Sequence, residues 1–188
     1  MAVLNEEQEM LRDMAREWTV NESPVTEFRK VRASGEPEAF NRDAYATMAQ
    51  MGWAGVIIPE EHGGSDFGFL SAGLVVEELG KTLTASPLVM NTVAASAIVL
   101  GGSDEQKARW LPRLASGEAI APLAVDEGPS HDPAKIETSV SDGKLSGTKA
   151  FVHEAHGADL FVVAAKDGLY LVEKGDGVSL TTRKLTDQ

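Results

Sequence analysis

Apolar residues recur at the spacing of an α-helix through the first part of the chain. Leu11, Met14, Ala15 and Trp18 fall on one side of such a helix, and Asn5 stands where a capping side chain is needed. Similar spacing, with glycine or proline near the ends, indicates that more helices follow. These further predicted helices cover residues 23–35, 41–51, 70–80, 86–100 and 103–116.

The last two of these helices have the clearest character. Residues 86–100 are apolar nearly all round, so this helix should be buried on most sides, with Asn91 as its one strongly polar residue. The next helix begins with a capping box, in which Ser103 and Gln106 each bond the main-chain N–H of the other. Pro112 and then Gly117 are expected to end it.

The pattern changes to short alternating runs from Ala119 onward. Asp142-Gly143 and Asp167-Gly168 are two-residue hairpin signals, and residues 175–177 form a third turn signal. The predicted strands cover residues 119–125, 136–141, 144–153, 159–165, 169–173 and 178–182. We therefore predict an α+β multidomain protein, with an N-terminal all-α helical bundle over residues 1–118 and a small antiparallel β-barrel or sandwich domain, incomplete, over residues 119–188.

Composition narrows the range of partners. The 188 residues carry a net charge of −12, which argues against nucleic acid and against an anionic membrane surface as partners. The chain has no cysteine, so disulfides, thiolate metal sites and a cysteine nucleophile are excluded. The N-terminus lacks a basic leader and an apolar segment, and no apolar run approaches the roughly 20 residues of a membrane span. A soluble, cytoplasmic protein is the expectation.

Four ordered blocks of sequence carry a resemblance to a known family. They are MGWAGVIIPEEHGG at 51–64, VVEELGK at 75–81, GSDEQKARWLPRLASGEAIAPLAVDE at 102–127 and GADLFVVAA at 157–165. Together they resemble acyl-CoA dehydrogenases. The resemblance implies an FAD-dependent oxidoreductase of fatty acid and lipid metabolism that converts an acyl-CoA thioester into a 2,3-enoyl-CoA. It also implies a tetramer, and a flavoprotein as electron acceptor.

The resemblance places part of the machinery outside these residues. In the family a second helical domain follows the β domain and usually carries the catalytic glutamate. This chain ends at Gln188, so no catalytic residue is expected in this segment, and the base would come from elsewhere. Glu60 and Glu61, which lie in a glycine-flanked loop, are interpreted as surface acids rather than as substitutes for that base.

The implied contacts with FAD come from two strand ends. The candidate flavin-binding residues are Leu123, Val125, Asp126, Phe151, Val152 and His153. The candidate substrate-binding residues are Asn91, His131 and Asp132. The flavin ring would lie between the two strand ends.

Both strand ends depart from the family's residues. The family has a Leu-Thr-Glu-Pro type of sequence on the first strand and Trp-Ile-Thr or Trp-Ile-Ser on the second. Here the corresponding residues are Val125-Asp126-Glu127 and Phe151-Val152-His153. Phe151 keeps an aromatic face and His153 keeps a hydrogen-bond donor. The carboxylate of Asp126, however, would oppose the negative charge that hydride transfer places on the flavin.

These departures leave several interpretations open. One alternative is a non-catalytic partner subunit with a degenerate flavin cradle, in a heteromeric acyl-CoA dehydrogenase of the steroid side-chain type. Another is an acyl-CoA-binding protein without redox activity. For single residues, Phe151 could be a core residue, Asp126 an acid at a turn, and Asn91 a partner for a buried backbone group. His153 and His156 lack a third metal ligand nearby.

Overall fold

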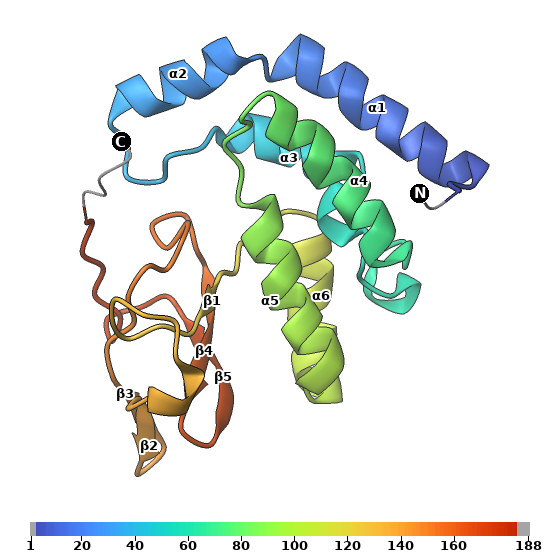
Figure 1. Cartoon of the computed structure of the whole chain (residues 1–188). Coiled ribbons are helices and arrows are strands. Elements are labelled where there is room, and N and C mark those ends of the chain that lie inside the picture. Colours follow the sequence, from blue (N-terminus) through green and yellow to red (C-terminus); the bar gives the residue numbers. More distant parts are fainter. Residues whose placement is uncertain (1–2, 184–188) are drawn as a thin grey trace.

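The computed structural model describes residues 3–183, and residues 184–188 of the predicted second domain lie outside this range. The α-helices are α1 (Glu6–Glu22), α2 (Val25–Ser34), α3 (Arg42–Gln50), α4 (Gly68–Lys81), α5 (Leu88–Gly101) and α6 (Asp104–Ala115). The strands are β1 (Leu123–Ala124), β2 (Ser139–Ser141), β3 (Lys144–Ser146), β4 (Leu160–Ala165) and β5 (Gly168–Glu173). Figure 1 shows α1 and α2 along one side of the molecule and the strands at the other.

Two helices begin where their capping signals predict. The side chain of Asn5 accepts a hydrogen bond from the main-chain N–H of Gln8 at 2.8 Å, and the Gln8 side chain accepts one from the N–H of Asn5 at 3.1 Å. Ser103 and Gln106 form the same reciprocal pair at the start of α6. Each box satisfies two N–H groups that a helix start leaves without a partner.

The helix predicted over residues 23–35 begins later than expected, whereas the one predicted over residues 103–116 ends close to its expected end, although Pro112 lies inside it. Pro24, rather than Ser23, occupies the capping position of α2, because the Ser23 hydroxyl is hydrogen bonded to that of Thr84 at 2.9 Å. Pro112 does not end α6, which continues to Ala115. Proline costs a helix one hydrogen bond, but the fully buried Leu111 and Leu114 flank it, and their burial outweighs that cost.

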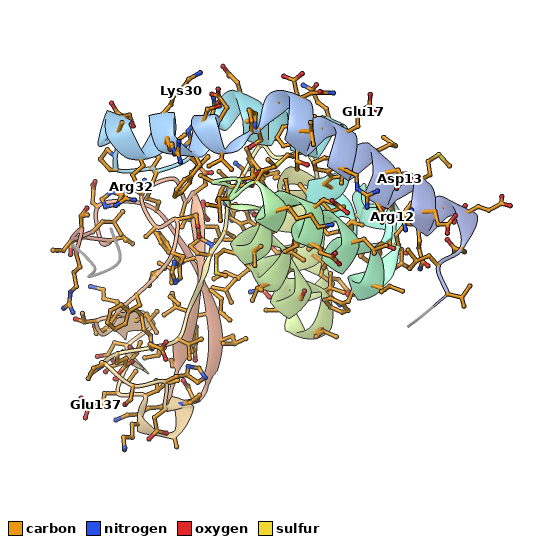
Figure 2. The ribbon with its side chains drawn as sticks, turned by 45° about the horizontal axis from the view of Figure 1, so that its top comes forward. Arg12, Asp13, Glu17, Lys30, Arg32 and Glu137 are labelled. Atoms are coloured by element: carbon orange, nitrogen blue, oxygen red, sulfur yellow. The ribbon has the colours of Figure 1, made fainter. Side chains whose placement is uncertain are left out.

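The helical part is built around two tryptophans. Trp18 of α1 and Trp53 of the 3₁₀-helix η1 (Trp53–Gly55) meet edge to face, with ring centroids 5.5 Å apart. Met48 and Val75 pack into the same cluster and are almost fully buried. By contrast, α2 has no buried residue, and Figure 2 shows Lys30 pointing away from the body of the molecule.

A second core cluster joins the helices to the sheet. Ile98 of α5 and Leu111 of α6 pack with Leu160 and Val162 of β4. The alternate residues of β4 point to the opposite face of the sheet, where Phe161 belongs to a third cluster with Ala124 and Ala158. Strand β4 is therefore buried on both faces, and it anchors the β part to the helices.

The strands form a three-stranded sheet and a separate hairpin. The sheet order is β1-β4-β5, with β1 parallel to β4 and β4 antiparallel to β5, while β2 pairs with β3. Among residues 3–183 no closed barrel forms, and the β1–β4 pair is parallel rather than antiparallel. The predicted order of a helical part followed by a β part is confirmed.

Several predicted strands are shorter than expected. The strand predicted over 144–153 ends at Ser146, and residues 178–182 form none. The backbone of Phe151 and Glu154 has φ of 55° and 54°, in the left-handed region, which ends any extended run. A few residues later Gly157 lies against Phe40, so close that a Cβ on Gly157 would meet its ring at 2.6 Å.

One hairpin turn is as predicted and the other is displaced. Asp142 and Gly143 both have positive φ and join β2 to β3. In the second hairpin Ala165 pairs with Gly168, so the turn residues are Lys166 and Asp167, one position earlier than the predicted pair. This register keeps the apolar residues of β4 and β5 side by side.

The proposed domain boundary at residue 118 lies between α6 and β1, and it stays a prediction. Asn91 of α5 is fully buried and bridges the two sides of this boundary. Its side-chain N–H donates to the carbonyl of Leu114 at 3.3 Å, and its side-chain oxygen accepts from the N–H of Ala121 at 3.0 Å. Both parts thus share one buried polar contact as well as the core around β4.

Candidate functional site

The two strand ends singled out in the sequence are direct neighbours. The N–H of Ala150 donates to the carbonyl of Asp126 at 2.7 Å, and the Lys149 ammonium donates to the carbonyl of Val125 at 3.0 Å. The segments 123–127 and 149–153 therefore lie side by side at main-chain hydrogen-bonding distance. The expected position of a flavin ring between the two strand ends is therefore wrong, because direct hydrogen bonds join these ends and leave no space for a ring.

Glu127 holds this junction together. One oxygen of its carboxylate accepts hydrogen bonds from the Lys149 ammonium at 2.6 Å and from the hydroxyl and N–H of Thr138, and the other accepts from the N–H of Glu137. We call this set the Glu127 clamp. The Lys149 and Thr138 hydrogen bonds are the main reasons that the pKa of Glu127 falls to about 2.

The Glu127 clamp was missed in the sequence, although a signal for it exists. Glu127 follows the singled-out Asp126, and Lys149 stands two residues before the singled-out Phe151. Had the two segments been aligned as neighbours, an acid and a base at matching positions would have suggested a cross-strand ion pair. The Lys149 side chain is only 9% exposed, so the ion pair with Glu127 offsets part of the cost of burying it.

The carboxylate of Asp126 has a partner of its own. The Nδ1 atom of His131 lies 2.8 Å from Oδ1 of Asp126, so the acid expected to repel a ligand is paired with an imidazole. Asp132 accepts from the N–H of Ala134 at 3.2 Å and pairs with the Lys135 ammonium at 2.8 Å. Asp132 is therefore paired with an ammonium group, and Asp126 is in contact with an imidazole.

Phe151 and His153 face an open hollow. This hollow, about 540 Å³ in volume, is lined by residues 37–39, 149–156 and 179–183, and we call it the Phe151 hollow. Phe151 is 46% exposed, so the interpretation of Phe151 as a core residue is wrong. Its left-handed backbone turns the ring away from the sheet, and non-glycine residues held in that conformation are concentrated at binding sites.

Glu154 is a further residue in the wall of the Phe151 hollow that the sequence did not single out. Its Oε2 atom is buried and has no hydrogen-bond partner among the described residues. Burial raises the pKa of this carboxyl group, which favours the protonated form. On the same side, Nε2 of His156 is hydrogen bonded to the hydroxyl of Thr182 at 2.8 Å, which fixes its ring.

The remaining candidate residues lie in packed surroundings. Leu123 pairs with Val162 across the parallel strands and packs against the core shared with the helices. Val152 packs on the opposite face of the sheet, in the cluster of Phe161. Asn91 has both amide atoms bonded to main-chain groups and lines neither the Phe151 hollow nor the strand ends. The structure thus gathers Asp126 with His131, and Phe151 with His153, and leaves Asn91 apart.

The residues at this site are compatible with a flat, mostly apolar ring. Phe151 offers an exposed aromatic face, His153 is exposed beside it, and the hollow continues from them. Aromatic rings stack on such faces, and a hydrogen-bond donor at the edge fixes their orientation. The carboxylate of Asp126 lies at hydrogen-bonding distance from the imidazole of His131. The exposed ring of Phe151 and the neighbouring imidazole of His153 are therefore compatible with a flavin ring.

Comparison with known proteins decides the family. The family model described as "Acyl-CoA dehydrogenase, N-terminal domain" matches residues 5–118, more than half of the chain. The chain belongs to the acyl-CoA dehydrogenase family. The likeness extends beyond the matched residues into the β part, since the relatives described next align with most of the sequence.

Two relatives illustrate the range of activities within the acyl-CoA dehydrogenase family. Acryloyl-CoA reductase (NADH) from Anaerotignum propionicum is 32% identical, over 92% of this chain and 47% of that protein. (2S)-methylsuccinyl-CoA dehydrogenase from Cereibacter sphaeroides is 35% identical, over 88% of this chain and 31% of that protein. The chain spans about half or less of the length of these relatives.

Solved structures of the family share the fold. A variant of the Tcur3481-Tcur3483 steroid ACAD has a TM-score of 0.81 and 31% identity, covering 89% of this chain and 48% of that one. The ChsE4-ChsE5 complex from Mycobacterium tuberculosis has a TM-score of 0.83 and 26% identity, and the match covers 96% of this chain and 51% of that one. An acyl-CoA dehydrogenase complexed with FAD from Bacillus anthracis has a TM-score of 0.82 and 28% identity, and the match covers 97% of this chain and 34% of that one.

The helices of this family member are short. Across residues 3–183, none combines the length and the apolar character that crossing a lipid bilayer requires.

Proposed function

We propose that the chain forms part of an FAD-dependent acyl-CoA dehydrogenase, which converts an acyl-CoA thioester into the 2,3-enoyl-CoA. The observation that carries this proposal is the exposed Phe151 ring beside a hollow, at two hydrogen-bonded strand ends, in a chain that belongs to the family. In this reaction the α proton leaves to a base and the β hydrogen leaves as hydride. In this proposal the base would come from outside residues 1–188.

The chain's own residues would hold and orient the cofactor. A bound flavin supplies the acceptor for the hydride. In this proposal the ring lies across the strand ends, against Phe151, and His153 donates a hydrogen bond to its edge. The Glu127 clamp keeps the segments on which these residues stand in register, because Glu127 is bonded to Lys149, two residues before Phe151. Water is excluded from one face of the ring by Phe151.

A second candidate function rests on the same site. The residues Asp126, His131 and His153 differ from those expected in the family. In addition, the chain is similar to the Tcur3481-Tcur3483 steroid ACAD and to the ChsE4-ChsE5 complex, whose names each give two chains. The alternative is therefore a non-catalytic partner subunit of a heteromeric acyl-CoA dehydrogenase. In such a complex, the cofactor and the base would be held mainly by the partner chain.

The proposal extends to partners. An acyl-CoA would be the substrate, another acyl-CoA dehydrogenase subunit would complete the oligomer, and an electron-accepting flavoprotein would reoxidise the cofactor. The chain is also similar to a solved structure of the electron transferring flavoprotein of Acidaminococcus fermentans, with a TM-score of 0.77 and 28% identity. A cytoplasmic tetramer is the proposed setting.

The decisive experiment is to purify the protein after expression alone and after co-expression with a neighbouring homologue. Our leading proposal predicts visible flavin absorption in the protein expressed alone, and enoyl-CoA formation with an artificial electron acceptor. A colourless protein that gains flavin only with its partner would favour the second candidate. If both preparations are colourless and bind no added FAD, both redox proposals are wrong.

A further inference from the structure

The backbone that surrounds the Phe151 hollow has an unusual conformation. Six non-glycine residues among residues 3–183 have positive φ, and three of them, Ala39, Phe151 and Glu154, line this one hollow. The left-handed conformation costs a non-glycine residue free energy, so it persists only where the surrounding structure imposes it, and it is concentrated at binding sites. The shape of this wall is therefore imposed by the fold.

Contacts from other parts of the chain hold the wall in place. Nη2 of Arg42, at the start of α3, donates to the carbonyl of Gly157 at 3.4 Å, and the ring of Phe40 packs against Gly157. The Lys174 ammonium, directly after β5, donates to the carbonyl of His156 at 2.7 Å. The wall is thus fixed from the helical part and from the sheet, as a binding site with a defined geometry requires.

Glu154 is the residue of this wall whose side chain lacks a partner. Its Oε2 atom is shielded from solvent and forms no hydrogen bond within residues 3–183. By comparison, the other acid that lines the hollow, Glu38, accepts two hydrogen bonds from Arg42 at 2.7 Å. A carboxyl group that has lost water without gaining a partner destabilises the fold. A ligand that supplies the missing partner accounts for its presence.

The chemistry of the carboxyl group limits what this partner can be. Burial raises the pKa of Glu154, which favours the protonated form. A protonated carboxyl group carries a donating O–H beside an accepting C=O. It is complementary to a ring edge on which an N–H stands next to a carbonyl, because two parallel hydrogen bonds can then form. The pyrimidine part of a flavin ring has such an imide edge.

We propose that Glu154 is a specificity-determining residue of the Phe151 hollow, and that its carboxyl group hydrogen bonds the imide edge of a flavin ring that lies on Phe151. This inference rests on the proposed function for the identity of the ligand. Phe151 supplies contact area that any aromatic ring can use. Glu154 selects among such rings, because a buried polar group disfavours a ligand that leaves it unpaired.

The test measures the binding of lumiflavin, and of 3-methyllumiflavin, in which a methyl group replaces the imide hydrogen, to the purified protein prepared without bound FAD. Fluorescence titration gives both dissociation constants for the wild type, Glu154→Gln and Glu154→Ala. We expect the wild type to bind lumiflavin about tenfold more tightly than its methylated form, because a hydrogen bond is lost. Glu154→Gln should keep a preference of at least about threefold, since an amide also offers a donor and an acceptor. Glu154→Ala should bind both within about twofold of each other.

The ratio of the two affinities separates recognition from structural damage. A variant that only distorts the hollow weakens both ligands by the same factor and leaves the preference unchanged. If Glu154→Ala behaves in this way, or if the wild type binds both ligands equally, the inference is wrong while the proposed function stands. Failure of the wild type to bind lumiflavin or FAD at all would instead overturn the proposed function, and this inference with it.

Glu118→Ala supplies the matched control. It removes an acid of the same type from an exposed position outside the Phe151 hollow, where Glu118 is paired with Arg113. This variant should keep the preference of the wild type within about twofold. If Glu118→Ala loses the preference as fully as Glu154→Ala does, overall charge decides the binding, and the assignment to Glu154 is wrong.

A spectroscopic measurement reports on the carboxyl group directly. Infrared difference spectra between the free and the lumiflavin-bound protein should show a shift of a carboxyl C=O band in the wild type, because its hydrogen bonding changes on binding. The shift should be absent in Glu154→Gln. Identical difference spectra for the two proteins would mean that Glu154 does not contact the ring.

Discussion

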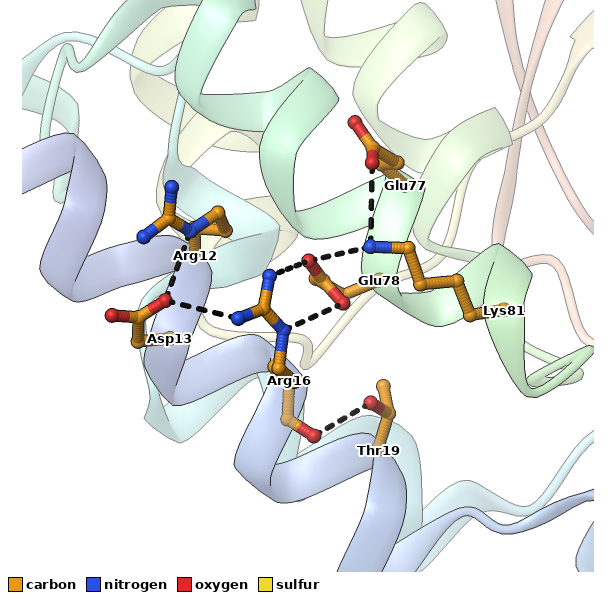
Figure 3. A network of polar contacts seen from close by, with 7 residues as sticks. All are labelled: Arg12, Asp13, Arg16, Thr19, Glu77, Glu78 and Lys81. Carbon is orange, nitrogen blue, oxygen red and sulfur yellow. Dashed lines mark hydrogen bonds and ion pairs between the residues drawn. The ribbon is translucent and has the colours of Figure 1, made fainter. Parts of the chain in front are cut away.

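Two carboxylates of this chain are surrounded by hydrogen-bond donors, one between helices and one between strand ends. Glu78 of α4 is 2% exposed and accepts from Arg16 of α1 at 3.0 Å and from Lys81 at 2.8 Å (Figure 3). Glu127 is 17% exposed and accepts from Lys149 and from three donors of residues 137 and 138. Both carboxylates accept hydrogen bonds from cations, but Glu78 joins two helices and Glu127 joins the two strand ends of the candidate site.

The difference lies in the partners. Both cations at Glu78 are about half exposed, so water can solvate them if the carboxylate is lost. Lys149 at Glu127 is 9% exposed and has only Glu127 and the Val125 carbonyl as acceptors among the described residues. The helical contact ties α1 to α4, whereas the Glu127 clamp also determines where the two strand ends of the candidate site lie. Glu78 therefore contributes to the stability of the fold, whereas Glu127 contributes both to stability and to the geometry of the candidate site.

The largest effect is expected for Glu127→Gln. Leaving Lys149 buried without its carboxylate should reduce the free energy of unfolding by about 3 kcal/mol. It should also lower FAD retention, because the strand ends lose their register. Chemical denaturation and bound-flavin absorption measure the two effects. The exposed ion pair of Arg113 with Glu118 gives the control, since Glu118→Gln should change stability by less than about 0.5 kcal/mol.

A smaller effect is expected for Glu78→Gln. We expect a loss of about 1–2 kcal/mol in the free energy of unfolding, because hydrogen bonds to the charged group are weakened while Arg16 and Lys81 remain solvated. FAD affinity of the folded protein should stay unchanged. If Glu78→Gln reduces flavin retention as much as Glu127→Gln does, the distinction between the two carboxylates is wrong.

The contribution of the Glu127 clamp to the free energy of unfolding should decrease in acid. Because the pKa of Glu127 is lowered to about 2 from an ordinary value of 4.5, the folded state holds this group ionised while the unfolded state takes up a proton. The stabilisation is therefore complete above about pH 4.5 and is lost as the pH falls toward 2. Unfolding curves between pH 5 and 2.5 should show a smaller loss of stability in Glu127→Gln than in the wild type.

Glu78 contributes in the same direction to this acid dependence. Burial raises the pKa of Glu78, but the hydrogen bonds from Arg16 and Lys81 outweigh burial and leave the pKa below its ordinary value. Glu78→Gln should therefore also flatten the curve. A double variant as steep as the wild type would contradict both assignments.

The smallest change in stability is expected for Phe151→Leu. The ring is 46% exposed, so the free energy of unfolding should change by less than about 0.5 kcal/mol. Loss of an aromatic contact should weaken FAD binding about fivefold. Phe69→Leu, on a 67% exposed side chain of α4, serves as the control in fluorescence titrations, and an equal loss of affinity there would remove Phe151 from the site.

Much of the helical part could be predicted because its signals are local. The capping boxes at Asn5 and Ser103 and the turn at Asp142-Gly143 each involve residues at most three positions apart. Hydrogen bonds of this range form in the same way whatever the rest of the chain does. The family resemblance then predicted which segments would meet, and the neighbouring strand ends agree with it.

Tertiary structure decided what depends on distant partners. Lys149 finds Glu127 across 22 positions and Arg16 finds Glu78 across 62, and no local pattern shows such contacts. Burial of Leu111 and Leu114 kept Pro112 inside a helix, and the left-handed turn at Phe151 moved a supposed core ring to a surface hollow. The sequence by itself determined where α1 and α6 begin and where the chain turns at Asp142-Gly143. Only packing determined which charges meet and which rings stay exposed, because both depend on surfaces that exist after the chain has folded.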